Sequence, residues 1–345
     1  MTALDFIKIG NHRVGEGNPA YVIAEIGFNH GGDMSLGIEM IKAAARAGAD
    51  AVKFQSYKAD ELVVESSEHF ALIKSGELDL EQHLQLSRVA AEYNITFFST
   101  PYSPPMVDLL EKVDVPAYKI ASMDLTNLPL IHYVAETQKP VLISTGMGTI
   151  DEIATALETI RQTGNQNVLL FHCISQYPAE PQNANLKSIT QLTEKFNTLV
   201  GYSDHVYGNA AALAAVTLGA TAIEKHFTSD KNLAGPDHAI SADESELLAL
   251  IEDIREVEKL LGRRGVDENR PDRIHAEAFR RSLHARTDIP QGAVITEQMI
   301  VTVRPGEGLP PSDINKLLGQ TATTDIAKGQ LMSWESIDSG EPPKD

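Results

Sequence analysis

Eight times in the first part of the chain, a short apolar run rich in β-branched residues is followed by an amphipathic stretch. The run has the length and composition of a buried strand, and the stretch has apolar residues three and four positions apart, as in a helix. Eight such units within about 260 residues are typical of a closed (β/α)8 TIM barrel. An open doubly wound sheet is the alternative, but no Gly-x-Gly-x-x-Gly motif follows the first run. The predicted strands end near Glu25, Phe54, Ser99, Ile120, Ser144, His172, Ser203 and His226.

A change in composition after Gly262 predicts that the barrel domain comprises residues 1–262. Residues 263–280 are charged and poor in apolar side chains, which indicates a linker. Beyond them, the pattern Asp-Ile-x-x-Gly-x followed by two apolar residues begins at Asp288 and again at Asp325. Two related turns of this kind predict a small β-rich domain over residues 281–345.

The formal net charge of −19 restricts what the chain can bind. Nucleic acid is excluded as a partner, because binding a polyanion needs a basic surface that releases counterions. No apolar run approaches the roughly 18 residues of a membrane span, and the N-terminal segment has no long apolar run of a secretion signal. The single cysteine, Cys173, forms no internal disulfide, so we expect a cytoplasmic protein. An anionic ligand would need a local cluster of cations.

Many polar side chains occur at the carboxyl ends of the predicted strands. In a (β/α)8 barrel these ends converge on one mouth, where catalytic groups lie. Between the second and third strands, residues 56–79 are long for such a connection and are interpreted as a candidate lid. The polar residues at the strand ends are Glu25, Lys53, Gln55, Thr100, Lys119, Ser122, Ser144, His172, Ser203, Asp204, His205, Glu224 and His226.

Two successive strands finish with histidines, His205 and His226. Adjacent strands bring these imidazoles close enough to bind one divalent cation with further positions open, which suits a catalytic Lewis acid. The structural alternative is that each histidine caps its strand through ordinary hydrogen bonds. We favour the metal site for the pair. His172 precedes Cys173 in an apolar run and is interpreted as a core histidine.

Lys53 and Lys119 interrupt apolar runs, where an unpaired ammonium group costs several kcal/mol. They either stay charged and bind an anion, with Ser144 and Ser203 as hydroxyl donors, or one of them is a Schiff-base nucleophile as in one class of aldolase. A salt-bridged structural role is the third alternative. Glu25 is a candidate general acid or base, and its structural alternative is an ion pair with a strand lysine.

Ten short motifs follow one another along the chain: AEIGFNHGGD, VKFQ, FFSTPYS, YKIAS, STGM, HCISQYP, GYSDH, EKHFT, GPDH and VRPGEG. From about Tyr21 to Ile337, they resemble the sialic acid (N-acetylneuraminate) synthase family. The resemblance implies a (β/α)8 barrel followed by an antifreeze-like (SAF) domain. It also implies a metal-dependent condensation of phosphoenolpyruvate with N-acetylmannosamine or a close derivative, with C–O cleavage and release of phosphate.

The resemblance further implies roles for individual residues. His205 and His226 would hold a divalent metal, usually manganese, with magnesium or cobalt as alternatives. Glu25 would be the acid/base residue beside the reacting carbons. Arg304 in the small domain would reach the N-acyl group of a sugar in the partner subunit's barrel, which implies a domain-swapped homodimer. Phosphoenolpyruvate would be held by Lys53, Lys119, Ser144 and Ser203, with help from Gln55, Thr100 and Ser122. The sugar site would be lined by Asp124, Ser175, Tyr177 and Asp237.

Two sugar-site positions depart from the sialic acid branch. Ser175 stands where that branch often has Asn, and Asp124 where Glu is common. The stretch FRRSL at 279–283 resembles the pseudaminic and legionaminic acid synthases, whereas GPDH resembles the sialic and legionaminic branches. The motifs do not decide whether the sugar substrate is N-acetylmannosamine or a 2,4-diacetamido-trideoxyhexose. A Schiff-base aldolase and a non-catalytic carbohydrate-binding protein are more distant alternatives.

Overall fold

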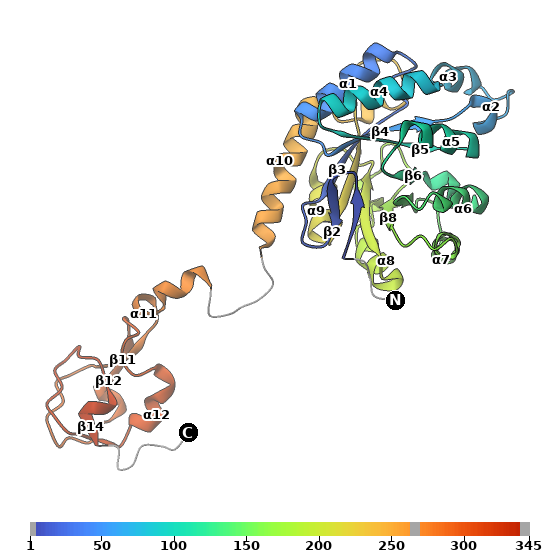
Figure 1. The fold of residues 1–345 in the computed structure, drawn as a ribbon. Helices are drawn as coiled ribbons and strands as arrows, with labels where there is room; N and C mark the ends of the chain where they lie inside the picture. Colours follow the sequence, from blue (N-terminus) through green and yellow to red (C-terminus); the bar gives the residue numbers. More distant parts are fainter. Residues whose placement is uncertain (1–4, 263–269, 339–345) are drawn as a thin grey trace. The chain divides into compact units, whose positions relative to one another are not determined.

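The computed structural model describes residues 5–262 and 270–338. The chain divides into two compact units, residues 1–262 and 263–345. In the first unit, eight parallel strands close into a barrel in the order β10-β3-β4-β5-β6-β7-β8-β9, which confirms the predicted (β/α)8 fold (Figure 1). The strands are β3 (Tyr21–Gly27), β4 (Ala51–Ser56), β5 (Thr96–Pro101), β6 (Tyr118–Ile120), β7 (Val141–Ser144), β8 (Val168–Cys173), β9 (Leu199–Asp204) and β10 (Ala222–His226).

Helices between and after the strands bury one apolar face each. In the last helix, Leu247, Leu250, Ile251 and Ile254 are buried, a spacing that follows the helical repeat. Within residues 5–262 and 270–338, no helix combines the length and the apolar character that crossing a membrane requires. The main helices are α1 (Met34–Arg46), α4 (Leu80–Glu92), α5 (Pro104–Val113), α6 (Leu128–Glu136), α7 (Ile150–Gln162), α8 (Ser188–Phe196), α9 (Ala210–Thr217) and α10 (Glu244–Leu261).

An N-terminal hairpin of β1 (Phe6–Ile9) and β2 (His12–Gly15), which was not predicted from the sequence, precedes the barrel. Its residues Ile7, Ile9 and Val14 are buried in the barrel core. The hairpin end lines a hollow together with the first residues of β9 and the residues just before β10. It therefore packs at the N-terminal end of the barrel, opposite the strand ends that carry the predicted site.

The candidate lid, residues 56–79, carries two short helices, α2 (Ala59–Leu62) and α3 (Phe70–Ser75). Glu77 holds this segment together. Its carboxylate accepts a hydrogen bond from the backbone N–H of Ala59 at 2.7 Å and pairs with Lys74 at 2.9 Å. The segment thus has an internal structure, and its movement over the mouth stays a prediction.

The second unit has a core of its own. Part of the predicted linker is helical, with a 3-10 turn at Pro271–His275 and α11 at Ala276–Phe279, whereas residues 263–269 lie outside the described residues. The predicted small domain is described as far as residue 338. It contains β11 (Ser282–Ala285), β12 (Ile300–Val303), α12 (Ile314–Leu317), β13 (Thr321–Ala322) and β14 (Ile337–Asp338).

The two related Asp-Ile turns of this unit pair with each other. Ile289 and Ile326 exchange two backbone hydrogen bonds, each of 2.8 Å. The carboxylate of Asp288 accepts from the N–H of Lys328, and that of Asp325 accepts from the N–H of Gln291. Each copy of the pattern therefore caps the other, which explains why the same residues occur twice.

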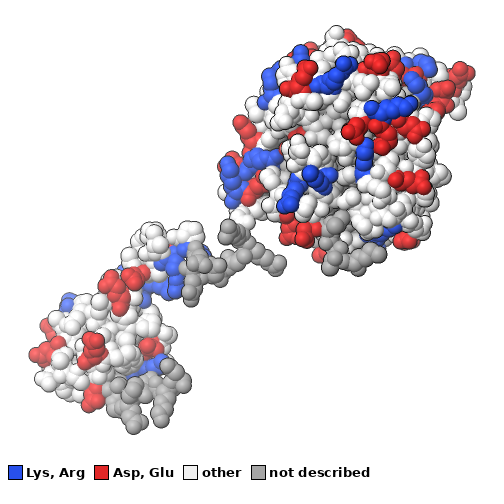
Figure 2. Space-filling model, in the orientation of Figure 1, with Lys and Arg blue, Asp and Glu red and all other residues white. Residues whose placement is uncertain are grey.

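Charged side chains of both signs are interspersed on the face of the first unit that Figure 2 shows. No broad field of lysine and arginine interrupts the acidic residues on that face.

Candidate active site

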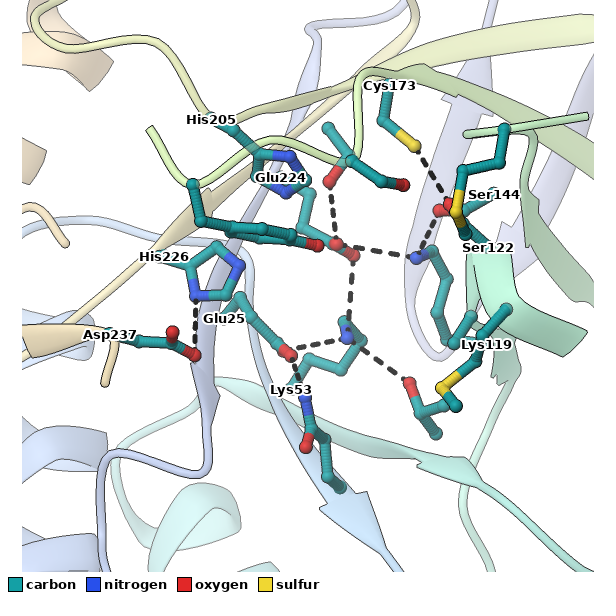
Figure 3. Close-up of a pocket in the computed structure, with 18 of the residues that line it drawn as sticks. Glu25, Lys53, Lys119, Ser122, Ser144, Cys173, His205, Glu224, His226 and Asp237 are labelled. Carbon is teal, nitrogen blue, oxygen red and sulfur yellow. Dashed lines mark hydrogen bonds and ion pairs between the residues drawn. The ribbon is translucent and has the colours of Figure 1, made fainter. Parts of the chain in front are cut away.

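A cavity of about 350 Å³ opens at the carboxyl ends of the barrel strands (Figure 3). Side chains from all eight strand ends or their following loops line it. Six lining residues were not predicted as site residues: Tyr102, Ala121, Met123, Met147, Cys173 and Glu224. The predicted residues that line the cavity are Glu25, Lys53, Gln55, Thr100, Lys119, Ser122, Ser144, Ser175, Tyr177, Ser203, His205, His226 and Asp237.

Two predicted site residues do not line this cavity. Asp124 ends a 3-10 turn after β6, and its Oδ1 accepts a hydrogen bond of 3.0 Å from Asn127. Its neighbour Met123 faces the cavity instead. Arg304 belongs to the second unit, where its exposed guanidinium lies 5.3 Å from the ring centre of Phe279. The roles of Asp124 and Arg304 stay predictions.

Two lysines and two glutamates form a buried cluster at the base of the cavity (Figure 3). Nζ of Lys53 lies 2.8 Å from Oε2 of Glu25 and 3.8 Å from Oε2 of Glu224. Nζ of Lys119 lies 3.3 Å from Oε1 of Glu224. None of the four side chains is more than 5% exposed. The charges balance within the cluster, which offsets the cost of burying them.

Hydroxyl groups surround the same two lysines. Ser144 accepts a hydrogen bond of 2.7 Å from Lys119, and Thr100 accepts one of 3.2 Å from Lys53. Ser203 donates to Oε1 of Glu224 at 3.0 Å. The cluster therefore presents two ammonium groups and three hydroxyls at one place, a donor set suited to an anion.

Glu224 was among the strand-end residues, but no role was predicted for it from the sequence. It lies two residues before His226 on β10, so both side chains point to the same side of the strand. This two-residue spacing is the sequence signal that could have placed Glu224 in the site. Only the closed barrel brings its carboxylate between lysines that come from β4 and β6.

The cluster shifts the pKa values of its members in opposite directions. Burial raises the pKa of Glu25 and outweighs the attraction of Lys53. Burial also acts to raise the pKa of Glu224, but attraction to Lys119 and Lys53 prevails and lowers it. Burial lowers the pKa of Lys119. Glu224 is therefore the ionised counter-charge of the lysines, whereas Glu25 takes up a proton more readily than an ordinary carboxyl group.

His205 and His226 lie side by side at the rim of this cluster, with ring centres 5.3 Å apart (Figure 3). Nδ1 of His205 donates to the carbonyl oxygen of Ile174 at 2.7 Å, so its Nε2 carries the lone pair. Nδ1 of His226 lies 3.7 Å from Oδ2 of Asp237 and has no hydrogen-bond partner in the described part of the chain. Burial lowers the pKa of each imidazole to about 4, so both rings are neutral at neutral pH.

This arrangement fits a divalent cation. Neutral imidazoles are metal ligands, and a hydrogen bond from the second ring nitrogen to a carbonyl is the usual support for such a ligand. Strand capping accounts for one nitrogen of His205 but for neither nitrogen of His226. Across residues 5–262 and 270–338, no three His, Cys, Asp or Glu side chains form a group that could hold an ion. If a cation binds here, the two imidazoles would be its protein ligands, and water or substrate would complete the coordination.

Asp204 and Lys225 support the two histidines from behind. Lys225 lies between Glu224 and His226 and points to the other side of β10, where its Nζ lies 2.8 Å from Oδ2 of Asp204. Nζ of Lys225 also donates to the carbonyl of Val206, which follows His205. His172 has a different role, because it is buried and its Nε2 donates to the carbonyl of Ala184, as expected for a core histidine.

The cavity wall at Ser122 and Ser175 is packed closely around Gly146. Its N–H donates to Oγ of Ser122 at 3.1 Å, and a Cβ at this position would lie 2.5 Å from Oγ of Ser175. A larger residue there would force these side chains to shift. Oγ of Ser175 is buried without a hydrogen-bond partner among the described residues, so it is available to form a hydrogen bond with a ligand in the cavity.

Comparisons with known proteins agree with the motifs. A model of the NeuB family matches residues 40–265, and a model of the SAF domain matches residues 280–338. The chain is 38% identical to N,N'-diacetyllegionaminic acid synthase of Legionella pneumophila, over 94% of this chain and 96% of that protein. It is 32% identical to human N-acetylneuraminate-9-phosphate synthase, over 94% of this chain and 95% of that protein.

A solved structure gives the same answer for the fold. The N-acetylneuraminic acid (sialic acid) synthetase of Leptospira borgpetersenii, in complex with citrate, is 37% identical and superposes with a TM-score of 0.76. The similarity covers 78% of this chain and 94% of that one. The resemblance inferred from the ten motifs is confirmed, and the chain belongs to the NeuB family, with a SAF domain after its barrel.

Proposed function

We propose that this chain is a nonulosonic acid synthase, which condenses phosphoenolpyruvate with an N-acylated mannosamine-type sugar and releases phosphate. One observation supports this above all others. A single cavity holds two buried lysines beside three hydroxyls and, at its rim, two neutral histidines with an available ring nitrogen each. The first group suits a phosphorylated carboxylate, and the second suits a cation next to a sugar carbonyl.

Lys53 and Lys119 bind the phosphate and carboxylate of phosphoenolpyruvate in this proposal. The substrate brings about three negative charges into an acidic protein, so it needs cations that are already in place. The buried carboxylates keep both lysines charged and oriented before the substrate enters. Ser144, Ser203 and Thr100 add hydroxyl contacts to the anion.

His205 and His226 would hold a divalent metal, with manganese as the expected ion. When bound, the metal would supply Lewis-acid chemistry by withdrawing electron density from the carbonyl of the open-chain sugar. Tyr177 packs against both rings, with ring centres 4.2 Å from His205 and 5.6 Å from His226, and so limits their rotation.

The bond changes follow from these positions. C3 of phosphoenolpyruvate attacks the sugar aldehyde, whose oxygen takes a proton from Glu25 and becomes a hydroxyl, and C2 becomes cationic. Water adds to C2 and returns a proton to Glu25. The C2–O bond to phosphate then breaks, the proton of the C2 hydroxyl leaves with the phosphate, and the products are a keto acid and inorganic phosphate. Glu25 is suited to moving this proton because its raised pKa makes both protonation states accessible.

A Schiff-base aldolase is the second candidate, because burial lowers the pKa of Lys119 and so favours a neutral amine. Contacts with Glu224 and Ser144 argue against it, since both stabilise the charged form. Trapping with borohydride and pyruvate separates the two. The condensation predicts no covalent adduct, whereas an aldolase would become labelled on lysine.

Phosphate release from phosphoenolpyruvate tests the proposal directly. We expect release only when manganese and an N-acylated mannosamine are both present. With phosphoenolpyruvate labelled by 18O in the bridging position, C–O cleavage places the label in phosphate. Label retained in the organic product, or no turnover with any such sugar, would refute the proposed reaction.

A further inference from the structure

Asn29 lies in the turn after β3, four residues beyond Glu25, and is 1% exposed. Its side-chain amide donates two hydrogen bonds of 2.9 Å, one to the carbonyl oxygen of Phe227 and one to Oγ of Ser241. The amide oxygen has no hydrogen-bond partner among the described residues. The side chain therefore bonds to this part of the chain through its two N–H groups, and both lead to segments far away in the sequence.

The first of these segments is the end of β10. Phe227 directly follows His226, which stands opposite Glu25 in the pairing of β10 with β3. The N–H of Phe227 donates to the carbonyl oxygen of Glu25 at 2.8 Å, and the carbonyl oxygen of Phe227 accepts from Asn29. Both polar backbone groups of Phe227 are thus held by β3 and its following turn. This fixes the backbone from which the ring of His226 projects.

The second segment, residues 237–242, carries Asp237. The hydroxyl of Ser241 accepts from Asn29 and donates to the carbonyl oxygen of Asp237 at 2.7 Å. The N–H of Ala242 donates to the carbonyl oxygen of His226 at 2.8 Å. Oδ2 of Asp237 lies 3.7 Å from Nδ1 of His226. The segment that Asn29 holds therefore approaches the same histidine from its other side.

One buried amide thus joins three segments that each contribute to the cavity wall. Their lining residues are Glu25, His226 and Asp237 (Figure 3). Asn29 itself is not among the residues that line the cavity. It can act on the site only through the segments that it connects.

We propose that Asn29 is a positioning residue of the metal site, which holds His226 and Asp237 in place relative to Glu25. This inference rests on the proposed function, which assigns a divalent metal to His205 and His226. Two imidazoles hold one ion well only if their lone pairs converge, so a shift of the β10 end weakens binding. Groups that support metal ligands typically contribute 10- to 100-fold in metal affinity.

A buried amide can also serve the stability of the fold alone, and Asn165 provides the matched control. It is likewise 1% exposed, and its amide donates to the carbonyl oxygens of Ala135 at 3.3 Å and Lys139 at 2.8 Å. Asn165 precedes β8 and so lies at the end of the barrel away from the cavity. Replacing it removes the same kind of contacts without touching the site.

Manganese affinity separates the two roles. It is measured by electron paramagnetic resonance in the parent protein, in Asn29→Ala and in Asn165→Ala, and denaturant unfolding of the metal-free proteins is measured beside it. We expect both variants to lose stability, because each leaves two buried acceptors without their donor. Only Asn29→Ala should lose manganese affinity, by about 10-fold.

Ser241→Ala keeps the proposal testable if Asn29→Ala does not fold. It leaves the bond from Asn29 to Phe227 in place and removes the one to Ser241, so we expect a smaller loss of manganese affinity, about 3-fold. Unchanged affinity in Asn29→Ala, or in Ser241→Ala where the first variant does not fold, would overturn the inference. An equal loss in Asn165→Ala would overturn it as well.

The proposed function fails in a different way. Its metal site predicts that the parent protein binds manganese and that His205→Ala does not. If manganese binding is the same in both, the metal site itself is refuted, and the role of Asn29 with it. If only the parent protein binds manganese, the metal site stands whatever the variants of Asn29 and Ser241 show.

Discussion

Oε1 of Glu224 lies 3.3 Å from Nζ of Lys119, although 105 residues separate them in the chain. The contact crosses the barrel from β10 to β6 and makes Glu224 the shared counter-charge of both buried lysines. This pair allows the cavity to hold cations before an anionic substrate arrives.

Replacing Glu224 by Gln should destabilise the protein strongly, because two buried ammonium groups would then share one carboxylate. We expect a loss of about 3–5 kcal/mol in the free energy of unfolding, measured by denaturant titration. Glu158→Gln, at an exposed position on α7, serves as the control and should cost little. A variant of Glu224 as stable as that control would contradict the assigned charge balance.

Replacing Lys119 by Ala should weaken the binding of phosphoenolpyruvate. A lost contact to a buried charge costs about 2–5 kcal/mol, so KM for phosphoenolpyruvate should rise at least about 30-fold in steady-state assays. Lys139→Ala is the control, since Lys139 pairs with Glu111 outside the cavity. An unchanged KM in the Lys119 variant would exclude Lys119 from the anion site.

The raised pKa of Glu25 should appear in the pH dependence of stability. The folded protein binds a proton at this carboxyl more tightly than the unfolded chain, whose pKa is near 4.5. As pH rises from that value through the pKa of the folded state, the unfolded chain loses this proton at a lower pH than the folded protein does. The free energy of unfolding therefore falls with rising pH across this window. In Glu25→Gln, this decrease in the free energy of unfolding with rising pH should disappear. Parallel curves for the variant and the parent protein, from unfolding at several pH values, would contradict it.

Replacing Lys225 by Met should loosen the segment that follows His205 and lower the affinity for manganese. Supports of metal ligands typically contribute 10- to 100-fold in affinity, so a loss of about 10-fold is expected in a manganese titration followed by electron paramagnetic resonance. KM for phosphoenolpyruvate should change little, because Lys53 and Lys119 do not contact Lys225. A rise in this KM without any loss of manganese affinity would show that Lys225 supports the anion site instead.

The barrel and most of the cavity could be predicted from the sequence because each apolar run ends in polar residues, and parallel strands bring such ends to one mouth. Glu224 was present in that pattern, but its role depends on reaching lysines of two distant strands. Local periodicity carries no information about such contacts. The same reason applies to Lys225, whose alternation with His226 places it behind the site.

Two other features have local causes. The role of Asp124 in the sugar site stays a prediction, because the short turn after β6 brings its Oδ1 to Asn127, whereas Met123 lines the cavity. The N-terminal hairpin was missed although Gly10 and Asn11 lie between two four-residue strands. A glycine–asparagine pair in that position is a hairpin signal.

Chelation offers the most direct test of the central claim, that two imidazoles hold a cation beside the lysines that bind phosphoenolpyruvate. Phosphate release should be measured before and after thorough treatment with a chelator, and again after manganese is restored. We predict that turnover disappears with chelation and returns with manganese in the parent protein but not in His205→Ala. Undiminished turnover after complete removal of divalent metal would contradict the account.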